Sequence, residues 1–340
     1  MAKTTINKYL PATLRPLLAL SAYGFIVYKL AGYYSHWQAR ELEETFDFSG
    51  GWFFVVVISM AVNWLLEAMR WQKLTAGIQH LSLYQSIKAV LTGITIGLLT
   101  PKRIGDVGGR CMMMPPGNRQ QGLLAFGVGS LLQSGVTLVY GALALLLLLA
   151  GEAHLQGPQG IILLLAALVP GSLLLLAVNN LPFVEKLLLK IPWLKKQAPA
   201  LAYLSNQKRN HLFRIFLLGM ARYLVFSTQF YLLLRMFGTH VSFSQAFIAI
   251  GLMYFLMAFI PVSSLAELGI RGSIAAFAFG LFTPHTEGAI LAASGLWIIN
   301  LALPALTGAW IIGTSNYKFN VAPIRLKPGR AKRYRPLEIP

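Results

Sequence analysis

Residues 122–151 read GLLAFGVGSLLQSGVTLVYGALALLLLLAG, a stretch without a single Asp, Glu, Lys or Arg. A helix that crosses a membrane needs roughly 20 apolar residues, because the hydrocarbon core is about 30 Å thick and a helix rises about 1.5 Å per residue. Three further blocks also lack these charged residues, namely 157–184, 236–266 and 288–317. A soluble bundle would interrupt such blocks with a polar face every turn or two. The sequence therefore predicts an all-helical integral membrane protein.

Composition supports the same conclusion. The chain is 56% hydrophobic and only 12% charged, whereas a soluble domain carries about 25% charged residues. The net charge of +18 does not indicate a nucleic-acid partner, since the basic residues cluster between apolar blocks, as the positive-inside rule predicts. Anionic lipid head groups are the simpler partner for these clusters. The single cysteine, Cys111, excludes an internal disulfide, and no metal-binding spacing occurs.

Six full spans are predicted from hydropathy. They lie near residues 14–35, 50–70, 122–150, 159–178, 212–235 and 287–312. With the N-terminus in the cytoplasm, most Lys and Arg clusters and the basic tail 316–340 lie inside, while the acidic segment 41–47 lies outside. Residues 181–210 are typical of interfacial helices on the inner leaflet. We expect a multi-pass protein of the cytoplasmic membrane with both termini in the cytoplasm.

Two further apolar stretches, 85–116 and 243–283, do not resemble simple spans. Each is an apolar arm, a break marked by proline and polar residues, and a second arm. The first arms, Ser86–Thr100 and Ser244–Ile260, are short for a bilayer. A re-entrant helical hairpin, whose broken backbone is sheltered by protein or by a wet cavity, fits this pattern.

The two interrupted stretches are similar to each other. Gln85 and Pro101 align with Gln245 and Pro261 at an offset of 160, and an acidic-x-Gly-x-Arg sequence follows each proline. The predicted topology sends the two hairpins into the membrane from opposite sides, so the units, about 50–116 and 212–283, would be inverted copies within one membrane domain, 1–315. Inverted repeats with broken helices are a common transporter architecture, with the substrate near mid-depth.

These motifs resemble a known family. Pro101-x-x-Ile104-Gly105-Asp106 with Arg110, and Pro261-x-x-x-x-x-Glu267-x-Gly269-x-Arg271, look like the two motifs of the lysylphosphatidylglycerol synthase transmembrane region. That region is the flippase-like half of the multiple peptide resistance factor and also occurs as stand-alone membrane proteins. Since 340 residues leave no room for an aminoacyl-transferase domain, we expect a stand-alone member. The resemblance implies lipid transport, with the hairpin breaks at Pro101, Gly105, Pro261 and Gly269.

The paired charges of the two motifs are the main candidates for a binding site. Asp106 with Arg110 and Glu267 with Arg271 are each four residues apart, a spacing that places both side chains on one helix face. Ionisable groups inside a membrane are costly, by roughly 2.5–3.5 kcal/mol on insertion scales, and usually mark pathways. The alternative is that each pair is a salt bridge that only pins a broken helix.

The starts of the second arms would also favour the binding of negatively charged groups. If the second arms begin near Ile104 and Leu265, each acid lies in a first turn, where the helix dipole favours negative charge. The free N–H groups there could equally hold a phosphate, with arginine as a two-pronged clamp.

Other charged residues have more than one interpretation. Lys102 and Arg103 either recruit a head group or extend to the membrane surface. Arg222 lies well inside the fifth span and needs a partner from another helix or an anionic ligand. Glu67 and Arg70 are predicted to be interfacial.

We expect a transporter that moves an anionic or phosphate-bearing lipid, either a phospholipid or a polyprenyl-phosphate-type lipid, between leaflets. The motifs contain no P-loop, serine-hydrolase or zinc signature, so neither catalysis nor a cofactor or metal is predicted. Two alternatives stay open: an integral-membrane enzyme or accessory subunit acting on a lipid-linked donor, and a scaffold with a basic cytoplasmic face. A homo-oligomer is compatible with the sequence.

Overall fold

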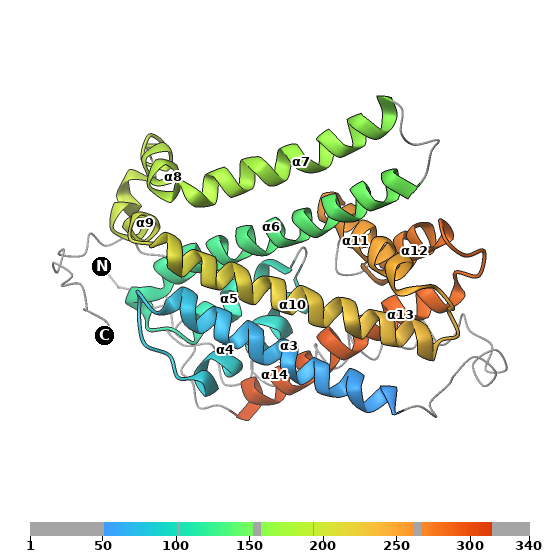
Figure 1. Cartoon of the computed structure of the whole chain (residues 1–340). Coiled ribbons are helices and arrows are strands. Elements are labelled where there is room, and N and C mark those ends of the chain that lie inside the picture. The colour runs from blue at the N-terminus through green and yellow to red at the C-terminus, as the bar shows by residue number, and fades with distance from the viewer. Residues whose placement is uncertain (1–50, 101–102, 152–157, 193, 261–266, 315–340) are drawn as a thin grey trace, which may run out of the picture.

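The computed structural model describes residues 51–100, 103–151, 158–192, 194–260 and 267–314, and its regular elements there are all helical (Figure 1). The longer elements are α3 (Trp52–Thr75), α4 (Leu83–Leu98), α5 (Ile104–Met112), α6 (Arg119–Gly151), α7 (Pro158–Asn179), α8 (Leu181–Leu188), α9 (Ala198–Ser205), α10 (Arg209–Met236), α11 (Phe243–Phe259), α12 (Glu267–Gly280), α13 (Glu287–Trp297) and α14 (Leu303–Thr314). A π-helical turn, Ile298–Ala302, joins α13 to α14.

Four helical segments are long and apolar enough to cross a membrane. They are Trp52–Thr75, Pro116–Gly151, Arg209–Met236 and Glu287–Thr314, and each corresponds to a predicted span. The predicted span near 159–178 is helical as α7, but it qualifies only where Gly171–Asn179 is counted together with α8, across a bend of 87°. The predicted span at 14–35 and the tail 316–340 lie outside the described residues. The protein is therefore an all-helical, multi-pass membrane protein.

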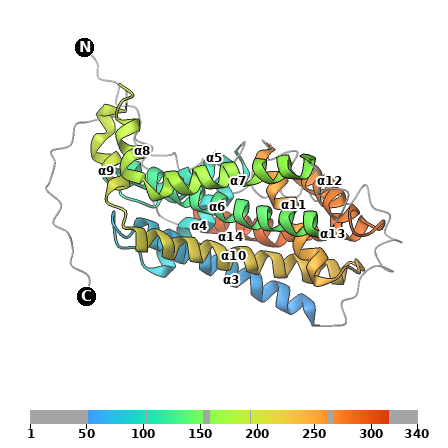
Figure 2. The same ribbon diagram turned by 45° about the horizontal axis from the view of Figure 1, so that its top comes forward.

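The long helices run side by side along the molecule (Figures 1 and 2). The helices α3, α6 and α10 contribute to two large hydrophobic cores, and a smaller cluster of Val136, Tyr140 and Tyr223 lies between them on α6 and α10. One core surrounds Trp71, Leu132 and Ile215 at one end of these helices, and the other surrounds Val56, Leu145 and Phe230 at the opposite end. The middle of each long helix therefore lies between two packed ends.

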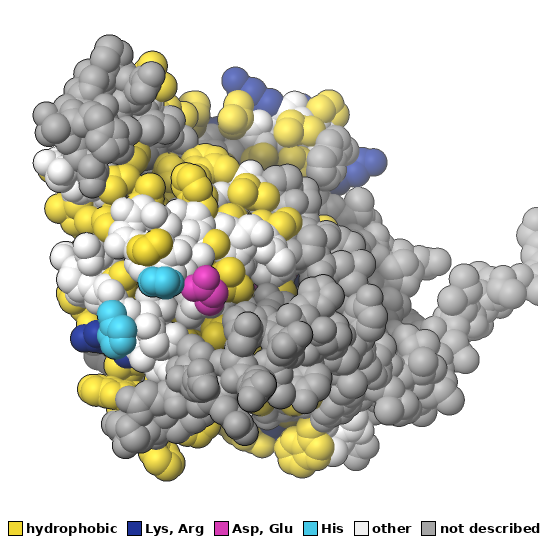
Figure 3. All heavy atoms as spheres, turned by 90° about the vertical axis from the view of Figure 1, so that its right-hand side faces the viewer, with side chains coloured by type: hydrophobic (Ala, Val, Ile, Leu, Met, Phe, Trp, Pro, Cys, Tyr) yellow, Lys and Arg dark blue, Asp and Glu magenta, His cyan; other side chains and the backbone are white. Residues whose placement is uncertain are grey.

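The outward faces of these helices are apolar. Phe54, Ile58, Leu173 and Trp310 are each more than 60% exposed. Large exposed apolar areas mark a membrane-facing surface rather than one that faces water. At the end where α12 and α13 lie, hydrophobic side chains are instead interspersed with histidine, charged and other polar or backbone atoms (Figure 3).

Both interrupted stretches begin with the same capping structure. Ser82 Oγ accepts a hydrogen bond from Gln85 N at 3.2 Å, and Gln85 Oε1 accepts one from Ser82 N at 2.9 Å. Ser242 and Gln245, 160 residues later, repeat both bonds at the same distances. Each is a capping box, in which two otherwise unsatisfied backbone donors are paired reciprocally. The sequence offset of the glutamines thus corresponds to a repeated local structure.

After each capped arm the helix is interrupted. α4 ends at Leu98 and α5 starts at Ile104, while α11 ends at Phe259 and α12 starts at Glu267. α4 begins at the end of the molecule where α3 ends, whereas α11 begins at the opposite end, where α10 ends (Figure 1). The two arms therefore enter the bundle from opposite ends.

The residues expected at the breaks are only partly described. Pro101, Lys102 and Pro261 lie outside the described residues. Gly105 and Gly269 lie in the first turns of α5 and α12, beyond the breaks.

Candidate functional site

Glycines bring α4 and α5 into backbone contact. A Cβ atom on Gly93 of α4 would overlap the Asp106 carboxylate and lie 2.8 Å from Arg110 Cγ. On α5, a Cβ atom on Gly109 would lie 2.7 Å from the Gly93 Cα atom. Small residues four apart allow helices to approach this closely inside a membrane. Arg110 is consequently buried, with 5% of its surface exposed.

The predicted pair on α5 is present. Arg110 donates from Nε to Asp106 Oδ1 at 2.7 Å and from Nη2 to Asp106 Oδ2 at 3.1 Å. Asp106 lies in the first turn of α5 and Arg110 in its last, as expected from the four-residue spacing. The two-pronged geometry fixes the guanidinium plane. This leaves Nη1 pointing away from α5.

Glu67 on α3 is the centre of the charge network. Its Oε1 accepts from Arg110 Nη1 at 2.6 Å, and its Oε2 lies 2.8 Å from Arg222 Nη1 and 3.3 Å from Arg70 Nη1. Only 3% of Glu67 and 6% of Arg70 are exposed. The prediction that these two residues are interfacial was therefore wrong. Sequence spacing could not reveal that α5 and α10 each bring an arginine to this face of α3.

Arg222, in the middle of α10, pairs with residues of another helix, as expected for an arginine inside a span. Besides its ion pair with Glu67, it donates from Nε to Asn63 Oδ1 at 2.8 Å. Asn63 donates in turn to Asn300 Oδ1 at 2.9 Å, and Asn300 donates to Gln229 Oε1 at 2.7 Å. Asn300 lies in the π-helical turn, a feature often found at functional sites. The amide chain was missed, because neutral polar residues in apolar spans carry little sequence signal.

The second motif meets the first through Arg103. Arg271 Nη2 lies 3.1 Å from Glu267 Oε1, which is the predicted pair on α12. Arg103 Nη2 lies 3.2 Å from the same oxygen. Arg103 precedes α5 in a left-handed conformation, with φ of 55°, which is uncommon for a non-glycine residue. The contact between the two motifs was not predicted.

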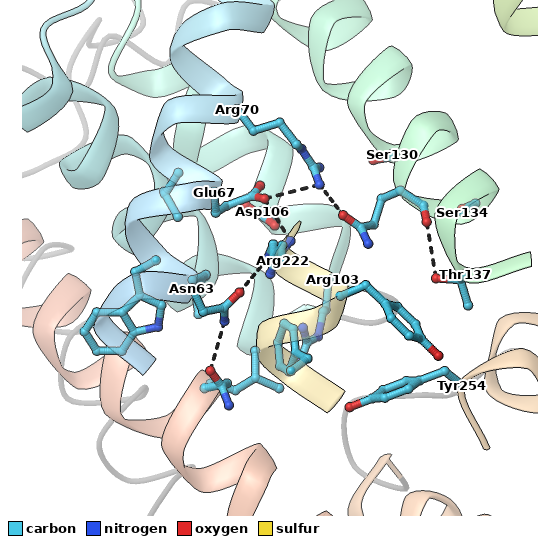
Figure 4. Close-up of a pocket in the computed structure, with 18 of the residues that line it drawn as sticks. Asn63, Glu67, Arg70, Arg103, Asp106, Ser130, Ser134, Thr137, Arg222 and Tyr254 are labelled. Carbon is cyan, nitrogen blue, oxygen red and sulfur yellow. Dashed lines mark hydrogen bonds and ion pairs between the residues drawn. The ribbon is translucent and has the colours of Figure 1, made fainter. Parts of the chain in front are cut away.

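These groups surround one cavity, with a volume of about 490 Å³ (Figure 4). Its charged lining residues are Arg70, Arg103, Arg110, Arg222, Arg271, Glu67 and Asp106. Counting Glu267 as well, five arginines face three carboxylates, so the described site has a net charge of +2. Asn63, Gln133 and Arg222 place the cavity midway along α3, α6 and α10, between the two cores.

In the described part of the chain, no group of three or more His, Cys, Asp or Glu side chains lies together. All three carboxylates of the cavity are in contact with arginine. The arrangement is suited to binding an anion rather than a cation.

The fold and the site together define a multi-pass helical membrane protein with a buried, arginine-rich cavity. Comparison with protein families identifies it further: the model of the lysylphosphatidylglycerol synthase TM region matches residues 17–308. The chain belongs to this family. No curated protein and no solved structure matches the chain.

Proposed function

We propose that this protein moves a phosphate-bearing lipid between the two leaflets of the membrane, and that the arginine-rich cavity holds the lipid head group. The observation that carries this proposal is the excess of positive charge in one cavity lined by residues of both motifs. Family membership supports a lipid-related role in the membrane.

Three arginines are the direct ligands in this proposal. Part of the side chain of Arg103, Arg222 and Arg271 is exposed, 36%, 22% and 12% respectively. Guanidinium groups recognise phosphate oxygens through two parallel hydrogen bonds. The site holds two more arginines than carboxylates, so a phosphate can bind to these arginines while the carboxylates keep arginine partners.

For Arg110 we propose a positioning role in place of the direct contact with the head group that the sequence predicted. Its Nε, Nη1 and Nη2 groups all donate to Asp106 or Glu67, and only 6% of its side chain is exposed. We therefore assign Arg110 and Asp106 to positioning Glu67, which in turn orients Arg222.

The path for the lipid follows from the placement of polar and apolar surface. The head group occupies the polar cavity at mid-depth, while the acyl or prenyl chains stay outside against apolar side chains such as Leu173 and Trp310. In the full proposal, six spans surround two re-entrant hairpins that are inverted copies, α4–α5 and α11–α12. Alternating exposure of the two units would open the cavity first to one leaflet and then to the other.

We also propose that the protein transports without catalysing a reaction. Every carboxylate lining the described cavity is paired with arginine, so the site offers no free general base. The free energy for transport would then come from the membrane potential, from an ion gradient or from movement of the lipid down its own gradient.

Lipid exchange in reconstituted liposomes tests the proposal. Purified protein is inserted into vesicles that contain a fluorescent phospholipid or polyprenyl phosphate, and dithionite reduces the label in the outer leaflet. We expect the protein to make the inner-leaflet label accessible for at least one phosphate-bearing lipid. A rate equal to that of protein-free vesicles for the whole panel would contradict the proposal. Metal-dependent release of the lipid phosphate would instead identify an enzyme.

A further inference from the structure

The helices α8 and α9 form a small unit at one end of the molecule, where α3 ends and α10 begins (Figures 1 and 2). The Tyr203 hydroxyl on α9 donates a hydrogen bond to the carbonyl oxygen of Leu74 at 2.9 Å. Nε2 of His211, near the start of α10, lies 2.9 Å from the carbonyl oxygen of Lys73. Both carbonyls belong to the last turn of α3, a helix of 24 residues that is long enough to cross the hydrocarbon core. The unit therefore lies at the level of the lipid head groups.

The direction of α8 is that of a helix lying along the membrane surface. Between Gly171–Asn179 of α7 and Leu181–Leu188 of α8 the chain bends by 87°. Because α7 runs beside the spanning helix α6 (Figures 1 and 2), a helix at nearly a right angle to α7 is parallel to the bilayer plane. Amphipathic helices take this orientation at the boundary between head groups and acyl chains.

Two different faces of α8 are apolar. Leu181 belongs to the hydrophobic core at this end of the molecule, and Val184 and Leu188 pack against that core. On the outward side, Phe183 is 66% exposed and Leu187 is 52% exposed. Since these two residues are four apart, they share one face of the helix. The helix is thus attached to the protein by one face and presents a second apolar face to its surroundings.

Four lysines flank this outward face. They are Lys186, Lys190, Lys195 and Lys196, and all four are exposed. In the described part of the chain none of them forms an ion pair with a carboxylate. Residues 181–209 contain six basic residues and one acidic residue, Glu185, whose carboxylate accepts a hydrogen bond from Ser205 Oγ. The surface therefore keeps an excess of positive charge that needs an anionic partner.

The apolar face and the lysines together favour one kind of partner. Nucleic acid or an acidic protein would neutralise the lysines but gain nothing from Phe183 and Leu187 at the height of the bilayer. A second copy of the chain would bring the same positive charge and be repelled. An anionic lipid surface fits both features, because acyl chains cover the apolar side chains while lysine ammonium groups extend to the phosphates.

We infer that α8 and the 3₁₀ turn Lys195–Gln197 bind anionic lipids of the leaflet that surrounds the end of α3, with Phe183 and Leu187 among the upper acyl carbons and the four lysines against the phosphates. This surface is separate from the arginine-rich cavity, since no cavity-lining residue comes from 181–209. The inference makes no use of the proposed transport, so each can fail without the other.

Fluorescence quenching in nanodiscs tests the inference. Full-length protein with Cys111→Ser and Leu187→Cys carries a bimane label on the new cysteine. The nanodiscs contain phosphatidylcholine and a small amount of spin-labelled phosphatidylglycerol or of spin-labelled phosphatidylcholine with the same chains. We expect the anionic spin label to quench the bimane at least two-fold more strongly, and added salt to reduce that ratio because it screens exposed charges. Equal quenching by the two lipids at low salt would overturn the inference.

A second labelling position serves as the control. Ile58 is 64% exposed on the apolar side of α3 and lies toward the opposite end of that helix. A bimane on Ile58→Cys should be quenched equally by both spin-labelled lipids, and water-soluble iodide should reach neither probe. Iodide quenching at Leu187→Cys would place the face in water. Shielding of that probe from both iodide and lipid would show that protein covers it, and either outcome would contradict the inference.

Replacing the lysines separates charge from packing. The first variant combines Lys186→Gln, Lys190→Gln, Lys195→Gln and Lys196→Gln. Because these side chains are exposed, the variant should keep the melting temperature of the parent protein in detergent, but its quenching ratio should fall close to one. The matched variant with arginine at the same four positions keeps the charge and should keep the ratio. A preference for the anionic lipid that survives in the glutamine variant, or is lost in the arginine variant, would refute the role of these lysines.

Discussion

Arg103 Nη2 lies 3.2 Å from Glu267 Oε1, so an ion pair joins the break after α4 to the first residue of α12 across 164 positions of sequence. Glu267 also holds Arg271, and one carboxylate therefore serves both interrupted helices. Loss of that carboxylate should affect both interrupted stretches at once.

Glu267→Gln alone should be strongly destabilising. Removing one partner of a buried pair typically costs about 3–5 kcal/mol, and the partial exposure of Arg103 favours the lower end of that range. The double variant Glu267→Gln with Arg271→Gln should recover much of the melting temperature in detergent but not the lipid exchange. Exchange at the wild-type rate by the double variant would show that the pair is only structural.

Glu67→Gln should be among the most damaging single changes in the chain. Three guanidinium groups lie 2.6–3.3 Å from this carboxylate, and they would repel one another after its neutralisation. We expect a loss of folded protein in size-exclusion chromatography and a melting temperature lower by more than 10 °C. Glu287→Gln, an exposed acid in the first turn of α13, is the control and should behave as wild type. A Glu67→Gln protein of normal stability would contradict the central role of this residue.

Arg222→Lys separates geometry from charge. Lysine keeps the positive charge but cannot reach both Asn63 and Glu67 with one planar group. Lipid exchange should fall about ten-fold, which corresponds to roughly 1.4 kcal/mol of lost interaction, while expression stays close to wild type. Arg214→Lys, exposed on the same helix, should leave exchange unchanged. Unchanged exchange in Arg222→Lys would remove this arginine from the proposed set of head-group ligands.

Gly93→Ala should disrupt the site through sterics alone. The added methyl group would overlap the Asp106 carboxylate and press on Arg110, so α4 and α5 would have to separate. Overpacking of this kind costs about 1–3 kcal/mol, and we expect lower thermal stability together with weaker exchange. Gly108→Ala on α5 meets no atom within 4 Å and serves as the control. Equal behaviour of the two variants would contradict the close packing of α4 on α5.

Cysteine labelling tests the orientation. In a Cys111→Ser background, a cysteine at Lys195 should react with an impermeant maleimide only after the cells are permeabilised. A cysteine at His285, exposed ahead of α13, should react in intact cells. These outcomes follow from the distribution of lysine and arginine. The reverse labelling pattern would place the N-terminus outside.

The long elements were predictable because their signals are local. An uncharged block such as 122–151 can satisfy its backbone inside a membrane only as a helix, and α6 duly spans Arg119–Gly151. The same holds for the i, i+4 pairs, since Asp106 and Arg110 meet within one short helix. The offset of Gln85 and Gln245 likewise marks a local motif, the capping box.

The centre of the site was not predictable in the same way. Glu67 lies 43 residues from Arg110 and 155 from Arg222, and its place near the end of a predicted span made it look interfacial. Only the packing of α3 against α5 and α10 brings the three together. The amides of Asn63, Gln229 and Asn300 depend on the same long-range packing, and they leave no charge for a sequence pattern to detect.

The glycine contact between α4 and α5 determines which parts of the molecule can move. Where two backbones meet without side chains between them, there are no rotamers to rearrange, so we expect α4 and α5 to move together as one rigid unit. The contact of these two helices with α12 depends on side chains instead. In the described chain, the only ion pair across it joins Arg103 to Glu267. A guanidinium can exchange a carboxylate for a phosphate without opening a void. In the proposed transport cycle, we therefore expect the protein to open at this ion pair, beside the arginines that would hold the phosphate.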